Sequence, residues 1–140
     1  MTPAKQATID NILQIAMTML KHGVKEKNHF SFILQKNRII GVGKNHLFKT
    51  HPKGQKYGYR YSAIHSELDA FLDLPREIDY RRLKLVNVRL SSKSLREKRP
   101  ILRMSKPCTH CSIWIKKIGF KEIWYSTDNG WELYANGSDG

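Results

Sequence analysis

The sequence predicts an α/β domain in which helices pack on a mixed sheet. Apolar side chains recur at helical spacing in three segments, residues 5–22, 62–74 and 108–118, and β-rich runs alternate with these segments along the chain. Such alternation is typical of a layered α/β architecture. The 140 residues fit a single domain spanning 1–140, of which only 136–140 resemble a frayed tail.

Each expected element has its own local signal. The first helix carries a stripe of Ile, Leu and Met side chains and ends at Gly23, and the second is closed by Pro75. The third is followed by Gly119, in the position where a helix end favours glycine. Strands are expected over four β-rich runs: 30–34, 39–42, 83–90 and 122–127.

The end of the chain predicts a hairpin. Residues 128–130, with the sequence Asp-Asn-Gly, separate the strand at 122–127 from a second β-rich run at 131–134. An Asn-Gly turn between two such runs favours antiparallel pairing. The last two strands are therefore expected to be antiparallel neighbours.

Positive charge is the strongest compositional feature. The chain has 25 Lys and Arg residues against 12 Asp and Glu residues, a formal net charge of +13. Such an excess attracts polyanions, whether nucleic acid or an anionic membrane surface. No apolar run approaches the ~20 residues of a membrane helix, and residues 1–7 lead into no apolar signal region. We therefore expect an intracellular, cytoplasmic protein with no membrane partner.

His65, Cys108 and Cys111 form a candidate zinc site. The two cysteines stand three positions apart on the first turn of a predicted helix, where both sulfurs can face one metal and the helix N-terminus favours thiolates. His65 would be the third ligand, leaving the fourth tetrahedral position to water, as in catalytic zinc sites. Zinc lowers the pKa of such a water toward ~7. One zinc ion per chain is expected.

Glu67 is the candidate catalytic residue. It lies two positions from His65 in one predicted helix and is not expected to bind the metal. A carboxylate there can take a proton from zinc-bound water and pass it to a ring nitrogen and to departing ammonia. Two alternatives stay open. The cysteines could form a redox dithiol, or a fourth ligand (His46, His51 or His110) could close a structural zinc site.

The pattern His-x-Glu followed by Pro-Cys-x-x-Cys, here at 65–67 and 107–111, resembles the signature of zinc-dependent nucleobase deaminases. Over residues 5–135 the chain looks like the cytidine and deoxycytidylate deaminase superfamily. This resemblance implies a three-layer α/β/α fold with about five strands, and the hydrolytic conversion of cytosine to uracil. The implied substrate contacts are Asn45 at the end of the second strand, Ser66, Pro107 and Tyr125.

The sequence departs from the superfamily pattern in three respects. Ser66 and Leu68-Asp69 replace residues often found around His-x-Glu, and the segment between His65 and Cys108 is longer than usual. The expected C-terminal hairpin resembles the branch of nucleoside deaminases and several toxin deaminases. The tRNA and APOBEC types instead place a helix between parallel last strands, which favours small or toxin-type substrates for this chain.

Two basic stretches lead into the helices of the candidate site. Residues 44–60 and 92–106 each carry a net charge of +5, which is +10 of the total of +13. Aromatic side chains interleave with the first stretch, a pattern suited to stacking unpaired bases. We expect single-stranded DNA or RNA as the substrate, held through several phosphates. The expected contacts are Lys49, Lys53, Lys56, Tyr57, Tyr59, Arg60, Arg96, Lys98, Arg99 and Arg103.

Other functions are compatible with these motifs. A free nucleotide such as deoxycytidylate is the alternative substrate, and adenine is the alternative base, since zinc hydroxide can attack its C6. A function of another class is a nucleic-acid-binding module with a purely structural zinc. Glu67 beside His65 argues against that module, because a structural site needs no proton shuttle.

Overall fold

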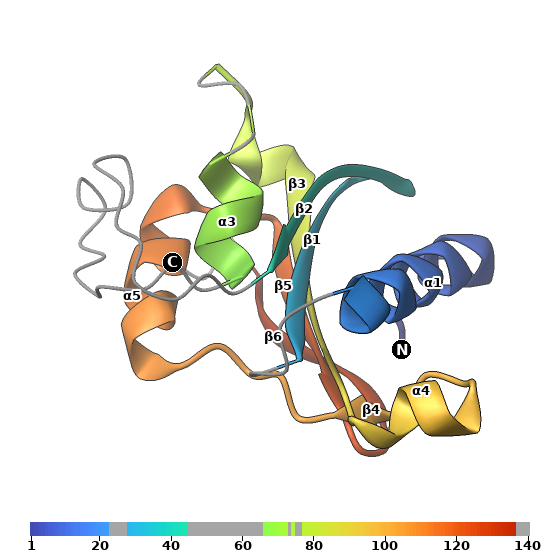
Figure 1. Cartoon of the computed structure of the whole chain (residues 1–140). Coiled ribbons are helices and arrows are strands. Elements are labelled where there is room, and N and C mark those ends of the chain that lie inside the picture. Colours follow the sequence, from blue (N-terminus) through green and yellow to red (C-terminus); the bar gives the residue numbers. More distant parts are fainter. Residues whose placement is uncertain (23–27, 45–65, 73, 75–76, 137–140) are drawn as a thin grey trace.

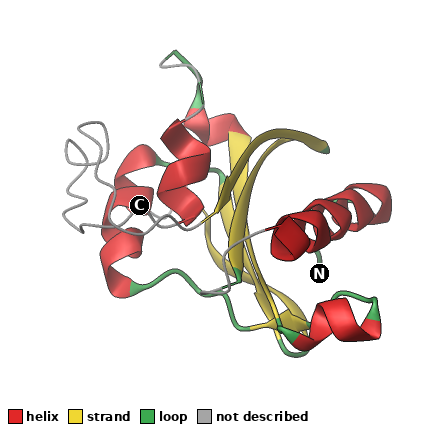
Figure 2. Ribbon diagram, in the orientation of Figure 1, coloured by secondary structure: helices red, strands yellow, loops and turns green. Residues whose placement is uncertain are grey.

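Helices lie on both sides of one central sheet (Figure 1, Figure 2). The computed structural model describes residues 1–22, 28–44, 66–72, 74 and 77–136. The expected α/β class, with a mixed sheet between helices, is confirmed. Among the described residues, no helix combines the length and the apolar character needed to cross a bilayer.

The sheet follows the strand order β2-β1-β3-β5-β6, and the short strand β4 pairs with β3. β3 and β5 are parallel, while every other pair is antiparallel. The pairing of β5 with β6 confirms the expected C-terminal hairpin. The strands are β1 His29–Gln35, β2 Arg38–Lys44, β3 Leu83–Leu90, β4 Leu102–Arg103, β5 Glu122–Thr127 and β6 Gly130–Asn136.

The helices divide between the two faces of the sheet. α1 lies on one face with α4 beside it, and α3 and α5 lie on the other (Figure 1). Their bounds are α1 Gln6–His22, α3 Ser66–Leu72, α4 Lys93–Glu97 and α5 Thr109–Ile118, with a short 3-10 turn at Tyr80–Arg82. α5 ends at Gly119, which has a φ of 85° and so adopts the left-handed conformation expected there.

Alternation along β3 builds a core on each face. Leu83 and Leu85 pack with α3 and α5, while Val86 and Val88 pack with α1. Because successive strand residues point to opposite faces, Asn87 shares the face of Leu85. A polar side chain therefore stands at the end of an apolar row, beneath the helices that carry the candidate site.

The second basic stretch contains structure that the sequence did not predict. Its first part forms α4, and its second part forms β4, whose Arg103 pairs with Arg89 of β3. Ser105 then bonds Ser126 of β5 through its backbone N–H, at 2.9 Å. β4 and the two residues after it, Met104 and Ser105, thus lie between the carboxyl ends of the parallel strands β3 and β5.

Two element boundaries, the start and the end of β6, differ from expectation. The C-terminal turn has Asp128 and Asn129 at its centre, because Thr127 pairs with Gly130 in the ladder. Asn136, expected in the tail, is the last residue of β6 and pairs with Glu122. The pairing of β6 with β5 extends to the end of the strand, which supplies the backbone partners that a frayed tail lacks. The rest of that predicted tail, 137–140, lies outside the described residues.

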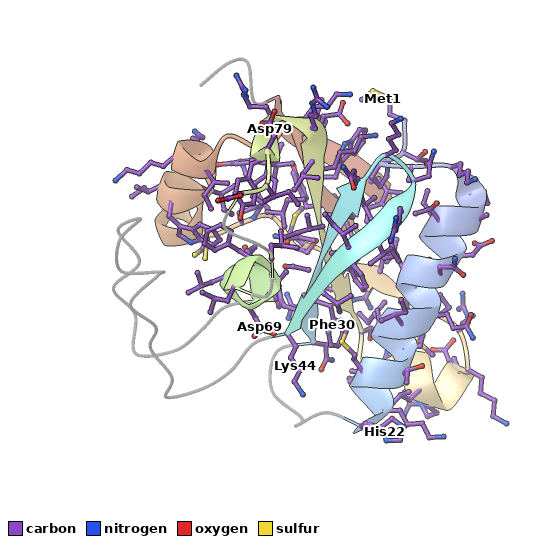
Figure 3. The ribbon with its side chains drawn as sticks, turned by 90° about the horizontal axis from the view of Figure 1, so that it is seen from above. Met1, His22, Phe30, Lys44, Asp69 and Asp79 are labelled. Carbon is purple, nitrogen blue, oxygen red and sulfur yellow. The ribbon has the colours of Figure 1, made fainter. Side chains whose placement is uncertain are left out.

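Gly43 lets β2 and α3 approach closely. A Cβ atom at this position would overlap the backbone N of Ala70 and the backbone O of Ser66. Nearby, the N–H of Lys44 donates to the Asp69 carboxylate at 2.9 Å, and both residues are labelled where the strand end meets the helix in Figure 3. The absence of a side chain at one strand position thus sets the position of the helix that carries Glu67.

Candidate active site

Glu67 lies on the first turn of α3 and is 6% exposed. Its two carboxylate oxygens have different partners. The Ser66 hydroxyl donates to Oε1 at 3.2 Å, and the Asn87 side-chain amide donates to Oε2 at 3.1 Å. A carboxylate held from two sides in this way has a fixed orientation, which proton transfer requires.

A buried polar network supports these partners of Glu67. The Ser31 hydroxyl donates to Asn87 Oδ1 at 2.7 Å and is 2.8 Å from the Ser66 hydroxyl. The Asn87 amide also donates to the Ser105 carbonyl at 3.3 Å. These residues are 2% exposed or less, apart from Glu67. Buried polar groups are costly unless bonded, so a connected network of this kind restricts the site to one arrangement.

The two cysteines lie at the N-terminus of α5. Cys108 is the N-cap, and its sulfur accepts a hydrogen bond from the Cys111 backbone N–H at 3.3 Å. Cys111 is fully buried, whereas Cys108 is exposed. Both sulfurs thus belong to one helical turn, as the spacing predicts, and Pro107 is buried directly before them.

The sulfur of Cys111 lies within the electrostatic reach of Glu67. The hydrogen bond with Cys108 raises the pKa of the Cys111 thiol, and burial and the negative charge of Glu67 raise it further. Glu67 on α3 and Cys111 on α5, more than forty positions apart in the sequence, therefore lie near enough to interact electrostatically. Of the residues expected in the catalytic centre, Cys108 and Cys111 share one helical turn, and Glu67 interacts electrostatically with Cys111.

This donor set fits zinc. Two cysteine sulfurs on one turn are ligands that zinc prefers, and a divalent cation stabilises the thiolates that burial alone disfavours. In the described part of the chain, no group of three or more His, Cys, Asp or Glu side chains forms a metal site. The third expected ligand, His65, lies outside the described residues, immediately before α3.

Tyr125 and Trp124 face opposite sides of β5, as strand alternation predicts. Trp124 is buried in the core beneath α1. Tyr125 is in register with Asn87 on the neighbouring strand, and therefore faces α5. Its hydroxyl donates to Glu132 at 2.6 Å, and this bond, together with burial, raises the pKa of Tyr125.

The other expected contacts are placed unevenly. Ser66 is 1% exposed, so its hydroxyl lies behind Glu67 and supports it. Arg96 lies on α4 with Lys98 and Arg99 directly after it, on the α1 side of the sheet and away from α5 (Figure 1). Arg103 lies on β4, paired with Arg89 of β3. The remaining expected contacts lie outside the described residues: Asn45, Lys49, Lys53, Lys56, Tyr57, Tyr59 and Arg60.

Sequence reasoning missed the support around Glu67. Asn87 interrupts the apolar alternation of β3, and Ser31 does the same in β1, where the two residues are register partners. A polar residue on the inward face of a strand is a signal that could have been noticed. The hydrogen bonds that link Ser31 to Asn87 and Asn87 to Glu67 could not have been predicted, because they depend on how α3 packs across β1.

Comparison of the chain with known protein families, with curated proteins and with solved structures finds no match.

Replacing Cys111 with serine should remove the metal. Serine keeps the size of the side chain but replaces the soft sulfur ligand, so zinc content should fall from about one ion per chain to a small fraction of that value. Elemental analysis of the purified proteins measures this. Ile113→Ser is the matched control, because Ile113 is 52% exposed on the same helix. Equal zinc in both variants would contradict the assignment of Cys111 as a ligand.

Replacing Asn87 with alanine should slow turnover with little effect on substrate binding. The change removes the donor to Glu67 Oε2 and leaves Ser31 without its acceptor, at a cost of about 1–3 kcal/mol in stability. We expect kcat to fall about tenfold or more while KM stays close to wild type. Asn129→Ala, in the exposed hairpin turn, is the control. A change in KM alone would show that Asn87 does not position the carboxylate.

Proposed function

We propose that this chain is a zinc-dependent hydrolytic deaminase that converts cytosine to uracil, with single-stranded nucleic acid as its substrate class. The observation that supports this most is a buried carboxylate, Glu67, that interacts electrostatically with Cys111, which shares one helical turn with Cys108. A buried, doubly hydrogen-bonded carboxylate beside two potential metal ligands suits proton transfer next to a metal. The three residues are also those that carry the resemblance to nucleobase deaminases.

The residues divide the work of this reaction. Cys108, Cys111 and His65 would hold zinc, which supplies a water of lowered pKa when bound. Glu67 accepts a proton on its carboxylate and returns it to the ring nitrogen and then to the leaving ammonia. Asn87 and Ser66 hold that carboxylate in place, at 3.1 Å and 3.2 Å. Tyr125 stands on the same face of the sheet and would bound one side of the base.

Charge supports a polynucleotide as the substrate. A free nucleotide needs one or two cations for its phosphate, whereas the chain carries a net charge of +13. Deaminases of polynucleotides act on single strands or on bases flipped out of a duplex, and a strongly basic chain suits the binding of both. The location would be that of the nucleic acid, in the cytoplasm or elsewhere in the cell that holds it.

A module with a structural zinc is the less favourable function. Such a module has no use for Glu67, and burying a carboxylate costs free energy unless it is paired and hydrogen-bonded. Here at least four residues, Ser31, Ser66, Asn87 and Ser105, are committed to the network that holds Glu67. A catalytic role for Glu67 explains why so many buried polar groups hold its carboxylate.

A parallel deamination assay tests the proposal. The zinc-loaded protein is given single-stranded DNA, single-stranded RNA, deoxycytidine monophosphate and cytidine, and uracil is measured in each. We expect uracil in a polynucleotide, with a rate that falls as salt rises. Turnover of the mononucleotide alone would contradict the polynucleotide assignment and leave a nucleotide-pool deaminase. Inosine from an adenine-containing strand, with no uracil, would contradict the choice of base.

A further inference from the structure

A polar pocket lies at the carboxyl ends of β3 and β5. Its volume is about 560 Å³. The lining residues are Asn28, Arg89, Leu90, Ser91, Ser92, Arg103, Met104 and Asp128. In parallel strands this end is where ligands bind, since the loops that leave the strands open there. The pocket shares none of its lining residues with the catalytic centre described above.

Two arginines lie side by side in the lining of this pocket. Arg89 on β3 and Arg103 on β4 are register partners in an antiparallel pair. Like charges directly opposite each other destabilise such a pair. Within the part of the chain that the structure describes, no carboxylate forms an ion pair with Arg89. Arg103 has one, Asp128, at 3.9 Å, with both side chains well exposed.

That single ion pair does not neutralise the pocket. Exposed pairs of this length contribute about 0–1 kcal/mol, and two guanidinium groups against one carboxylate leave a charge of +1 among the lining residues. Ser91, Ser92 and Asn28 add neutral hydrogen-bond donors. Paired guanidinium groups with neutral donors around them suit a phosphate group. Met104, 50% exposed, adds an apolar surface for a sugar or base.

The pocket is held to the catalytic centre by shared hydrogen bonds. The Ser126 hydroxyl accepts from the Arg89 backbone N–H at 3.0 Å and donates to the Arg103 carbonyl at 2.7 Å. The Ser105 hydroxyl, 2.8 Å from that of Ser126, donates to the Asn87 carbonyl at 2.9 Å. Asn87 in turn bonds Glu67. The two arginines therefore sit on backbone fixed relative to the catalytic carboxylate.

Arg89 also lies on the face of the sheet that carries Glu67. It is two residues beyond Asn87 on β3, so both side chains point to the same side, about 7 Å apart along the strand. Asn87 is covered by α3, whereas Arg89 is exposed. A single strand of nucleic acid that runs across this face of the sheet can thus have one nucleotide at the catalytic centre and a neighbouring phosphate at Arg89.

We infer that Arg89 and Arg103 form a binding site for a phosphodiester of single-stranded nucleic acid, next to the base that enters the catalytic centre. This phosphodiester site specifies the substrate class of the proposed deaminase, and the inference rests on that proposed function. Binding at the pocket is nevertheless measurable without any turnover.

The test measures binding of a short, fluorescein-labelled oligothymidine, which has no amino group to lose, to the full chain by anisotropy. Arg89→Gln and Arg103→Gln should each weaken binding by about five- to tenfold and lower the salt dependence by about one phosphate contact. Asp128→Asn should act in the opposite direction and tighten binding, because it removes the only carboxylate among the lining residues. The control is Lys121→Gln, which removes the same charge at the opposite end of the sheet, where Lys121 bonds the Leu83 carbonyl.

The outcomes separate the site from a general effect of charge. Loss in both arginine variants, gain in Asp128→Asn and little change in Lys121→Gln support the site. Equal losses in Lys121→Gln and the arginine variants, or weaker binding by Asp128→Asn, would overturn it. Variants that lose affinity for deoxycytidine monophosphate but keep that for oligothymidine would overturn the phosphodiester assignment. If the arginine variants behave as expected and the wild type produces no uracil, the pocket stands and the deaminase proposal fails.

Discussion

Replacing Glu67 with glutamine should abolish deamination while leaving zinc and fold in place. Glutamine has the same shape, and its amide oxygen can still accept from Asn87 while its nitrogen donates to the Ser66 hydroxyl. It cannot accept and return a proton at neutral pH, so the rate should fall by roughly 10²–10⁴-fold. Uracil formation in a cytosine-containing single strand measures the loss, and elemental analysis measures the metal.

Glu77→Gln is the matched control for this substitution. Glu77 is exposed, whereas Glu67 is buried, so the same chemical change at Glu77 should leave the rate unaffected. Turnover by Glu67→Gln at the wild-type rate would contradict the assignment of Glu67 as the proton shuttle. Loss of zinc in the variant would instead place Glu67 among the ligands, which contradicts the division of roles proposed above.

Replacing Gly43 with alanine should destabilise the protein and inactivate it together. The new Cβ atom would overlap the backbone of Ser66 and Ala70, and neither a helix backbone nor a strand backbone paired in the sheet can move aside as a flexible side chain can. Over-packing of a core usually costs about 1–3 kcal/mol, and a backbone overlap should reach the upper end of that range or exceed it. Chemical denaturation measures the change in the free energy of unfolding.

Gly41→Ala is the control, two residues earlier on the same strand and the same face. Its Cβ atom would lie 3.2 Å from the Ala70 carbonyl oxygen and 3.3 Å from a Leu74 side-chain carbon, which can shift. The expected cost is therefore clearly smaller than at Gly43. Equal stabilities of the two variants would show that α3 does not rest on Gly43 as the structure indicates.

Periodicity was sufficient to predict the sheet apart from β4, and the helices α1, α3 and α5. The alternation along β3 and the helical spacing of α1 report which side chains are buried, so both elements lie within a residue or so of their expected bounds. The Asp-Asn-Gly sequence predicted the β5–β6 hairpin because turn residues separate two β-rich runs, and Gly130 has a φ of 132° that other residues rarely adopt. Periodicity and turn preferences depend on residues that are neighbours in the sequence, so they can be recognised without the fold.

The rest of the candidate site depends on contacts between distant residues. No local pattern indicates that Ser105, eighteen positions after Asn87, bonds both that residue and Ser126. The basic stretch 92–106 appeared uniform because charge dominated it, and this concealed α4, β4 and the burial of Ser94 and Ser105. Counting charged residues gave the net charge of this stretch correctly, but only the fold shows that its Lys and Arg side chains lie on different sides of the sheet.

The most direct test of the proposed deaminase activity is to incubate the zinc-loaded protein with a cytosine-containing single strand in water enriched in oxygen-18. The product is then analysed for the isotope. Hydrolysis at a metal-bound water predicts uracil with the heavy isotope on its C4 oxygen, detected by mass spectrometry, and none with Glu67→Gln. Unchanged cytosine after incubation with the zinc-loaded wild type, across single-stranded DNA, RNA and free nucleotides, would contradict the central claim that these residues form a deaminase.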